Sequence, residues 1–505
     1  MSTTTSFPAC VGGLNAVDAI AAMPATDALV LENWFPQPSY VGLRNGYSMH
    51  ATGFPGWVES VFCYSSAAGN KIFGVSGTAV YDATSAGAVG AAVVTGLTNA
   101  RWEYVNTATA GGQFLYAANG ADKPLLYTGA AWVKVDGVST PAITGVTTTT
   151  LRSPAVWKNR VWFVQTGTMK AWYLPTASVG GAAASFDFGP IFDQGGELQA
   201  ILTASLTDGS TFDNYIGFLT TNGQLAIYNG TDPATAGLFN IVGVYDIGKP
   251  VGRRCFFRMG SDCIIICADG FVSLQKLISI GKFNQEKTTI SYKILTLVNA
   301  AVQTYKDNFG WQGVLHPLGN KVLVNVPQNE NLRQFQFVMN TISGAWCTFT
   351  NWNFATLAVQ GDVLYAGGAS YIAIADSTQA DNGSAINGTL KTAFSYFGTD
   401  KQKFVKMVRP LIETNGTITP SLAVNMDFSD QAPTNVGTYI GTLGSAWDTS
   451  PWDITPWAPG VFVQKDWKTV YGVGFSVALY VKVQSANITV NLQALDYVWG
   501  PGGVL

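Results

Sequence analysis

Short apolar runs separated by turn residues recur along most of the chain. In each unit an apolar or aromatic run precedes a turn that usually contains Gly or Asn, and a second run follows, often with an aromatic residue. Asn-Gly and Asp-Gly are the strongest of these turn signals, because tight hairpin turns require positive φ angles. The pattern predicts β-hairpins at residues 71–82, 113–127, 160–173, 215–228, 263–274, 321–338 and 362–374.

The spacing of these hairpins predicts a propeller. Successive units lie roughly 40 to 60 residues apart, which corresponds to one four-stranded blade per unit. A lone hairpin cannot bury its apolar face, whereas blades around an axis bury each face against the next blade. We therefore predict an all-β fold, with an irregular β-propeller of about six or seven blades over residues 56–380. A pair of large β-sandwiches is the alternative.

The regions outside the propeller have different patterns. Residues 376–388 are polar and rich in turn residues, which predicts a linker or a long loop. Beyond it, apolar alternation over 421–428 and longer runs at 470–483 and 487–495 predict an antiparallel β-sandwich over 389–505. Residues 1–55 are interpreted as an N-terminal arm that packs on the propeller or on a neighbouring subunit. Helical spacing is found at 287–306, and a short helix is expected at 15–23.

The composition indicates an assembled protein. The 505 residues are 47% hydrophobic and only 12% charged, about half the usual charged share. A surface with so few charges has poor colloidal stability unless partners cover it, most simply copies of the same chain. The formal net charge is -3 and no basic patch is present, which argues against strong binding to nucleic-acid phosphates.

Few residues are candidates for catalysis. The chain has two histidines, His50 and His316, and six scattered cysteines that we interpret as buried apolar residues. None of the motifs of serine hydrolases, zinc proteases, P-loop proteins or dinucleotide-binding proteins is present. We therefore expect no catalytic residue, no cofactor and no metal. Four aspartates are assigned to turns, although an acid pair at the propeller axis stays open; they are Asp213, Asp232, Asp262 and Asp269.

Three tryptophans recur every five residues in a proline-rich stretch. Trp447, Trp452 and Trp457 lie in AWDTSPWDITPWAPG, a spacing that fits neither a helix nor a strand. Either these side chains pin the loop to its own domain, or they form an interface with a subunit or receptor. The sequence has no secretion signal and no apolar run long enough to cross a membrane as a helix.

Two ends of the chain resemble a known family. The stretch Glu32, Asn33, Trp34, Phe35, Pro36, followed by Val41, Arg44 and Gly46, resembles the opening of tail-tube proteins from short-tailed bacteriophages. The tryptophan loop and the ending over 490–505 resemble segments of the same proteins. The family is the podovirus tail nozzle, also called tail tubular protein B or tail hub.

The resemblance implies a structural role in the virion tail. Members resemble β-propellers with extra β-domains, and six copies surround the DNA exit channel. The implied partners are the chain itself, the head-to-tail adaptor beneath the portal, and tail fibres or spikes. DNA would pass through without specific binding, assembly would occur in the host cytoplasm, and no membrane insertion is implied. The predicted interface anchors are Trp34, Phe35, Arg44, Trp447, Trp452 and Trp457.

Two other functions remain as alternatives. One is a receptor-binding or glycan-binding tail protein, a tailspike-like propeller that would need acids or exposed tryptophans in a cleft. The other is an ejected or DNA-binding tail protein, against which the lack of Lys and Arg clusters argues.

Overall fold

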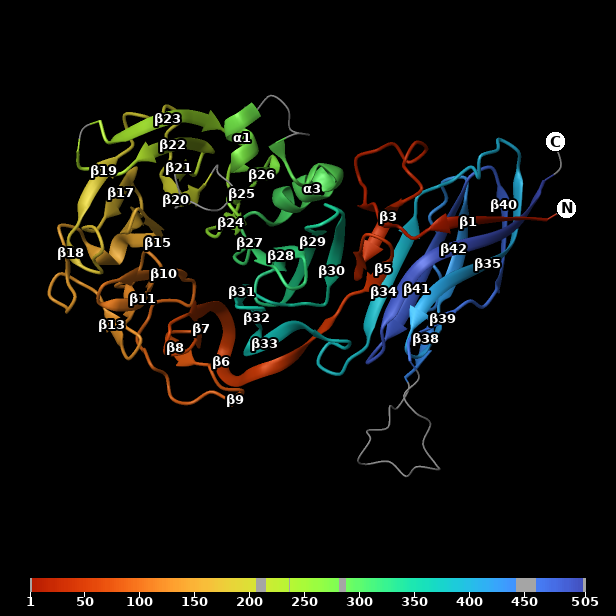
Figure 1. The fold of residues 1–505 in the computed structure, drawn as a ribbon, viewed down its shortest axis with the longest axis horizontal. Coiled ribbons are helices and arrows are strands. Elements are labelled where there is room, and N and C mark those ends of the chain that lie inside the picture. The colour runs from red at the N-terminus through yellow and green to blue at the C-terminus, as the bar shows by residue number, and fades with distance from the viewer. Residues whose placement is uncertain (1, 206–214, 236, 281–287, 442–459, 503–505) are drawn as a thin grey trace.

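Seven small antiparallel sheets stand around a common axis and form a β-propeller (Figure 1). The computed structural model describes residues 2–205, 215–235, 237–280, 288–441 and 460–502. Blade 1 combines the second part of β6 (Gly46–Tyr64) with β7 (Lys71–Ser76) and β8 (Ala79–Asp82). Blade 2 contains β10 (Glu103–Thr109), β11 (Gly112–Ala118), β12 (Leu125–Tyr127) and β13 (Trp132–Lys134).

The remaining blades follow in chain order. Blade 3 contains β15 (Leu151–Trp157), β16 (Arg160–Gln165), β17 (Lys170–Tyr173) and β19 (Ala184–Asp187). Blade 4 contains β20 (Leu198–Ala204), β21 (Tyr215–Thr220), β22 (Gln224–Gly230) and β23 (Phe239–Asp246). Blade 5 contains β24 (Phe256–Met259), β25 (Asp262–Cys267) and β26 (Gly270–Ser273). Blade 6 contains β27 (Gln312–His316), β28 (Lys321–Asn329), β29 (Arg333–Asn340) and β30 (Trp346–Thr350).

Blade 7 is completed by a strand from near the N-terminus. It contains β31 (Thr356–Gln360), β32 (Val363–Gly367), β33 (Ala369–Thr378) and the first part of β6. Within the 19-residue strand β6, Ser48 pairs with Ile374 of blade 7, and Val61 pairs with Gly74 of blade 1. One continuous strand therefore closes the ring by hydrogen-bonding to the last blade and to the first.

The hairpin predictions are confirmed. Each predicted hairpin forms two neighbouring antiparallel strands of a different blade, from β7–β8 in blade 1 to β32–β33 in blade 7. Separate hydrophobic clusters lie between neighbouring blades. Trp162 of blade 3 packs against Phe218 of blade 4, with ring centroids 5.7 Å apart. This inter-blade burial is what stabilises hairpins that could not fold alone.

Short elements connect these blades. Strands β9 (Gly87–Ala88), β14 (Ile143–Thr144) and β18 (Gly181–Ala182) lie in the loops, with the 3-10 turn η1 (Thr148–Thr150). After blade 5 come α1 (Leu274–Ile280), the 3-10 turn η2 (Tyr292–Ile294) and α3 (Leu295–Tyr305). The helix expected at 287–306 thus begins only at Leu295, because Thr289 bridges to Val272 of blade 5.

Two further sheets lie beside the propeller (Figure 1). The first extends blade 6 through β3 (Asp27–Glu32) to β34 (Ile386–Thr392), β41 (Val477–Ser485) and β37 (Ser421–Met426), with β2 (Gly13–Leu14) against β3. The second contains β39 (Phe462–Gln464), β40 (Lys468–Gly474), β35 (Lys403–Thr414), β42 (Val490–Pro501), β5 (Val41–Leu43), β4 (Trp34–Pro36) and β1 (Thr3–Pro8). Strands β36 (Thr417–Thr419) and β38 (Thr438–Ile440) form a small pair.

The N-terminal arm is built into both of these sheets. Strand β1 pairs with β42, and β3 lies between β30 of blade 6 and β34. Buried residues of both sheets and of blade 6 belong to one hydrophobic cluster, which includes Trp34, Val324, Val408 and Leu479. A separate sandwich domain over 389–505 stays a prediction, because these sheets share strands with the arm and with blade 6.

Three local predictions differ from the structure. Residues 15–23 form no helix, because the Ala16 carbonyl, which a helix would bond to the Ile20 N–H, accepts the Thr296 hydroxyl of α3 instead. The run 470–483 is divided into β40 and β41, since Asp427 accepts the N–H groups of Phe475 and Ser476 between them. Strand β6 begins at Gly46 and β34 at Ile386, so both start before the expected domain boundaries at 56 and 389.

All six cysteines are buried, as predicted from their apolar surroundings, and none forms a disulfide. Burial raises the pKa of the Cys10, Cys63 and Cys255 thiols to about 12. A thiol raised in this way stabilises the fold fully below its unfolded pKa, near 8.5. That contribution is lost as the pH rises from there toward about 12.

We expect thiol reagents to leave the native protein unmodified at pH 8, because the thiolate is the reacting form and the sulfur atoms are covered. Spectrophotometric titration should count six thiols only after unfolding in denaturant. The thermal midpoint should also fall between pH 8 and pH 10. Rapid modification of any thiol in the native chain would contradict the burial described above.

Candidate functional site

The Asn-Trp-Phe-Pro motif lies where the propeller meets the two additional sheets. Asn33, between β3 and β4, has a φ angle of 59°, which asparagine tolerates better than most residues. Its backbone N–H donates to Thr348 O at 2.7 Å, and its side-chain Nδ2 donates to Asn387 O at 2.8 Å. Its Oδ1 accepts from Thr350 N at 2.8 Å. One asparagine thus connects the arm, blade 6 and β34.

Arg44 completes this connection. Its Nε donates to Asn33 Oδ1 at 2.8 Å, and its two terminal nitrogens donate to the Asp381 carboxylate at 2.8 and 2.7 Å. The guanidinium carbon lies 5.1 Å from the ring centroid of Trp352, and a terminal nitrogen donates to Thr350 O. The Arg44 side chain is fully buried. We name the set Asn33, Arg44, Thr350, Asp381 and Asn387 the junction.

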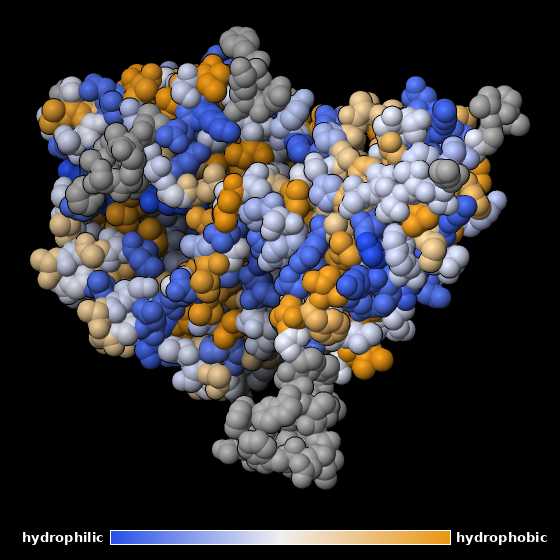
Figure 2. Space-filling view, turned by 45° about the vertical axis from the view of Figure 1, so that its right-hand side comes forward, coloured by the Kyte–Doolittle hydropathy of each residue, from blue (hydrophilic) through white to orange (hydrophobic). Residues whose placement is uncertain are grey.

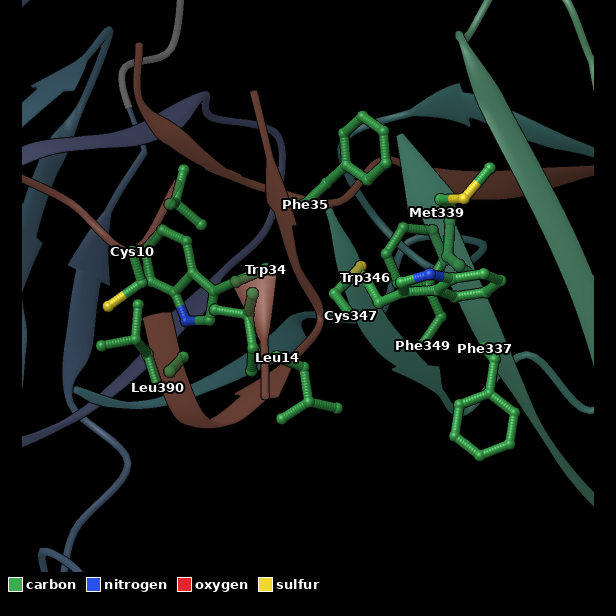
Figure 3. Close-up of a cluster of buried hydrophobic side chains, with 14 of the residues drawn as sticks. Cys10, Leu14, Trp34, Phe35, Phe337, Met339, Trp346, Cys347, Phe349 and Leu390 are labelled. Carbon is green, nitrogen blue, oxygen red and sulfur yellow. The ribbon is translucent and has the colours of Figure 1, made fainter. Parts of the chain in front are cut away.

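Trp34 and Phe35 fix the arm on either side of strand β4. Figure 3 shows Trp34 among Cys10 and Leu390, and Phe35 on the other side of the strand. Trp34 is 0% exposed and lies against Gly388, where an added Cβ atom would come within 2.7 Å of Trp34 Nε1. The ring of Phe35 packs edge-on against Phe349 of blade 6, with centroids 6.3 Å apart.

The polar segment 376–388 is anchored within the fold, with its first three residues in β33 and its last three in β34. Asp376 accepts from Lys321 Nζ at 2.5 Å, and its carboxylate lies 3.5 Å from Nδ1 of His316. Burial alone would raise the pKa of Asp376, but His316 and Lys321 outweigh it and hold the pKa below its usual value. These contacts fasten the start of the segment to blade 6, and Asp381 fastens its middle to Arg44. The part between the two strands is the long loop that was expected as one of the two possibilities.

A second polar cluster lies on the propeller axis. A cavity of about 210 Å³ is lined by first strands of blades 1, 2, 3, 5, 6 and 7 and by the residues just before them. Arg254 reaches across this centre. Its guanidinium donates to Glu59 O, Ser60 Oγ and Trp102 O on one side, and to Gln312 Oε1 and Thr356 Oγ1 on the other. One side chain therefore bonds to blades 1, 6 and 7 and to the segment leading into blade 2.

Further ion pairs surround Arg254. Arg101 bonds to Glu59 at 3.3 Å and Glu330 at 2.8 Å, and Arg253 lies 3.2 Å from Glu103. Burial lowers the pKa of Arg254 to about 10, which still leaves it charged at neutral pH. Burial also raises the pKa of the Tyr104 hydroxyl well above its usual value. The axis thus holds carboxylates whose arginine partners come from the same chain.

Glycoside hydrolysis uses a pair of carboxyl groups. Three carboxylates lie near the axis, those of Glu59, Glu103 and Glu330, and each is within ion-pair distance of an arginine of the same chain. The described acids among the four turn candidates have local roles: Asp232 and Asp262 bond to nearby backbone and side chains, and Asp269 accepts Gly248 N–H. Asp213 lies outside the described residues.

The predicted anchors have different outcomes. Trp34, Phe35 and Arg44 come together at the junction, although an intermolecular role for them stays a prediction. Trp447, Trp452 and Trp457 lie outside the described residues. Sequence reasoning missed Arg254 and Asp381, whose partners are far away in the chain. The only local signal for Arg254 was the Arg-Arg pair at 253–254, between the predicted hairpins at 215–228 and 263–274.

In the described part of the chain, no group of three or more His, Cys, Asp or Glu side chains is arranged to hold a metal ion. Within the same residues, no helix combines the length and apolar character needed to span a bilayer.

Comparisons with known proteins give only distant structural similarity. No protein-family model and no curated protein matches the chain. The β-propeller domain of Cps50 (Swd1) from Myceliophteria thermophila is 12% identical with a TM-score of 0.41, covering 66% of this chain and all of that one. Sqt1 of Saccharomyces cerevisiae is 11% identical with a TM-score of 0.38, covering 66% of this chain and 98% of that one. The computationally designed protein Ika8 is 8% identical, with a TM-score of 0.36 and coverage of 65% and 99%. Because these TM-scores are low, we assign the β-propeller from the arrangement of the sheets described above and not from these similarities.

Proposed function

We propose that this chain is a structural subunit of the tail nozzle of a short-tailed bacteriophage. Six copies would form a ring around the DNA exit channel beneath the head-to-tail adaptor. The observation that carries the proposal is the junction, because the Asn-Trp-Phe-Pro and Arg44 stretch that resembles this family holds the propeller and the additional sheets together. A subunit that bears load between neighbours needs such a rigid connection between its parts.

The distribution of charge and apolar surface also supports an assembly. Most polar side chains at the propeller axis are engaged within the chain, whereas several large apolar side chains are exposed elsewhere. Figure 2 shows hydrophobic residues at the surface over both the propeller and the additional sheets. Apolar surface of this kind is typical of protein contacts when it forms contiguous patches.

The mechanism we propose is passive. The subunits enclose a channel wide enough for duplex DNA, and a weakly acidic protein lets phosphates pass without binding them. Loops at the far end of the ring close the channel until the virion meets its host. A virion still full of DNA whose ring has a wide-open bore would require another protein as the gate.

Mass photometry and negative-stain imaging of the purified chain test the assembly. We expect particles of six times the 53.7 kDa chain mass, with sixfold symmetry and a central hole. Antibodies against the chain should in addition label the tails of purified virions. A stable trimer that binds or cleaves glycans, with unlabelled tails, would instead favour a receptor-binding tail protein.

A further inference from the structure

Two edge strands expose apolar side chains at opposite ends of the molecule (Figure 1). The first is β23, the outermost strand of blade 4, which pairs only with β22 among the described strands. The second is formed by β39 and β40, which both pair with β35 at the border of the second additional sheet. We name them the β23 edge and the β40 edge.

The β23 edge exposes several apolar side chains. Ile241, Val242 and Val244 are 47%, 40% and 42% exposed, and the preceding Leu238 is 47% exposed. Val242 is the extra residue of a β-bulge between the positions that pair with Ile227 and Tyr228, which brings two adjacent apolar side chains to the surface there. Phe239, by contrast, is anchored in the aromatic cluster with Tyr228, at a centroid distance of 4.5 Å.

The β40 edge has the same character. Tyr471, Val473 and Phe475 alternate along one face and are 75%, 41% and 49% exposed. On β39, the neighbouring Phe462 and Val463 are 40% and 45% exposed. The intervening Gly472 and Gly474 face inward against Met426 and Asp427, which leaves the aromatic and β-branched side chains on the outside.

The charges beside the two edges differ in balance. At the end of β23, the exposed Asp193 and Asp246 carboxylates both accept hydrogen bonds from Gln224. Beside the β40 edge lie Lys406, Lys465 and Lys468, together with the acidic residues Glu413, Asp427 and Asp466. Two β23 edges in contact would bring aspartates together, whereas the β40 edge offers lysines to those aspartates.

From this complementarity we infer that the β23 edge of one copy binds the β40 edge of the next. Because the two surfaces differ and lie at opposite ends, the contact is head-to-tail, and repetition closes a ring when the rotation between copies allows it. Each copy in a closed ring then covers both of its apolar edges. This inference rests on the proposed assembly and names the surfaces through which it forms.

Two arginine substitutions test the contact, one at each edge. In Val244→Arg and in Tyr471→Arg a charge enters apolar surface that the contact would bury. We expect either change to weaken association by about 30-fold or more, the loss typical of an interface hot spot. The controls are Leu332→Arg and Ile342→Arg, which alter apolar residues that are 63% and 65% exposed away from both edges. Circular dichroism and thermal midpoints check that all four variants fold.

A mixture of the two edge variants distinguishes contact between unlike edges from contact between two like edges. Each variant alone should be monomeric by sedimentation velocity, while the controls assemble like the unchanged chain. An equimolar mixture should form particles of two chains and no larger, because only one intact pair of unlike edges remains. Dimers of Val244→Arg alone would overturn the inference, since they would join two like edges.

The remaining outcomes separate this inference from the proposed function. Rings that persist in both edge variants would overturn the contact and leave the nozzle proposal standing. An unchanged chain that stays monomeric at every soluble concentration would overturn the self-contact, and the antibody labelling of virion tails would still decide the function. Unlabelled tails together with edge-dependent rings would reject the nozzle and retain the contact.

Discussion

Replacing Arg254 with methionine is expected to lower the stability of the propeller by about 3 kcal/mol, the cost of removing one partner from a buried charged network. The substitution removes all five hydrogen bonds that connect blades 1, 6 and 7 with the segment entering blade 2. It also leaves the backbone oxygens of Glu59 and Trp102 without this donor. The thermal midpoint, followed by circular dichroism, should fall by about 5 °C.

Two further variants serve as comparisons for Arg254→Met. Arg333→Met removes an exposed arginine from the start of β29, and we expect it to change stability by no more than about 0.5 kcal/mol. Arg254→Lys keeps the charge but not the planar set of donors. Its thermal midpoint should therefore lie between those of Arg254→Met and Arg333→Met. If Arg254→Met melts at the same temperature as Arg333→Met, the axial arginine does not hold the blades together.

Replacing Arg44 with methionine should destabilise the junction by about 4 kcal/mol, because the nearly buried Asp381 carboxylate loses its partner. The effect should be local as well as global. Hydrogen exchange measured by mass spectrometry should become faster in residues 376–388 and in the arm, since Asn33 and Asp381 both depend on Arg44. Blades 2 to 4 should keep their protection.

A double-mutant cycle isolates the pair. Asp381→Asn alone leaves Arg44 with a neutral partner, and the double variant Arg44→Met with Asp381→Asn leaves no charge unpaired. We expect the double variant to lose less stability than the sum of the single losses, by about 1–3 kcal/mol. Strictly additive losses would show that the two side chains do not stabilise the junction as a pair.

The sequence predicted local features well. Every predicted hairpin is present because its information is local: alternating apolar positions and a turn residue that accepts positive φ, such as Gly223 between β21 and β22. The short helix at 15–23 was predicted wrongly because its spacing could not show that the Ala16 carbonyl bonds to Thr296, far away in the chain. The break at Phe475 was missed because it depends on Asp427, which lies in the turn after β37.

Contacts between residues far apart in the chain could not be predicted from local sequence patterns. That β1 pairs with β42, or that Arg44 meets Asp381, follows from how the sheets meet and not from any pattern near those residues. The importance of the Asn33 stretch came only through a resemblance, since its role depends on Thr350 and Asn387. Arg254 looked like an ordinary charge before a strand, and only closure of the ring gives it five partners.

Ring closure by β6 has a consequence for synthesis of the protein. The first half of β6 is made early, but its partner β33 leaves the ribosome only after six other blades have been translated. Until then the first part of β6 lacks the neighbouring strand with which it forms blade 7. A chain that ends before β33 therefore lacks the strand that closes the ring, and the first part of β6 keeps an open edge. Closure of the propeller thus has to wait until almost all of its sequence has been translated.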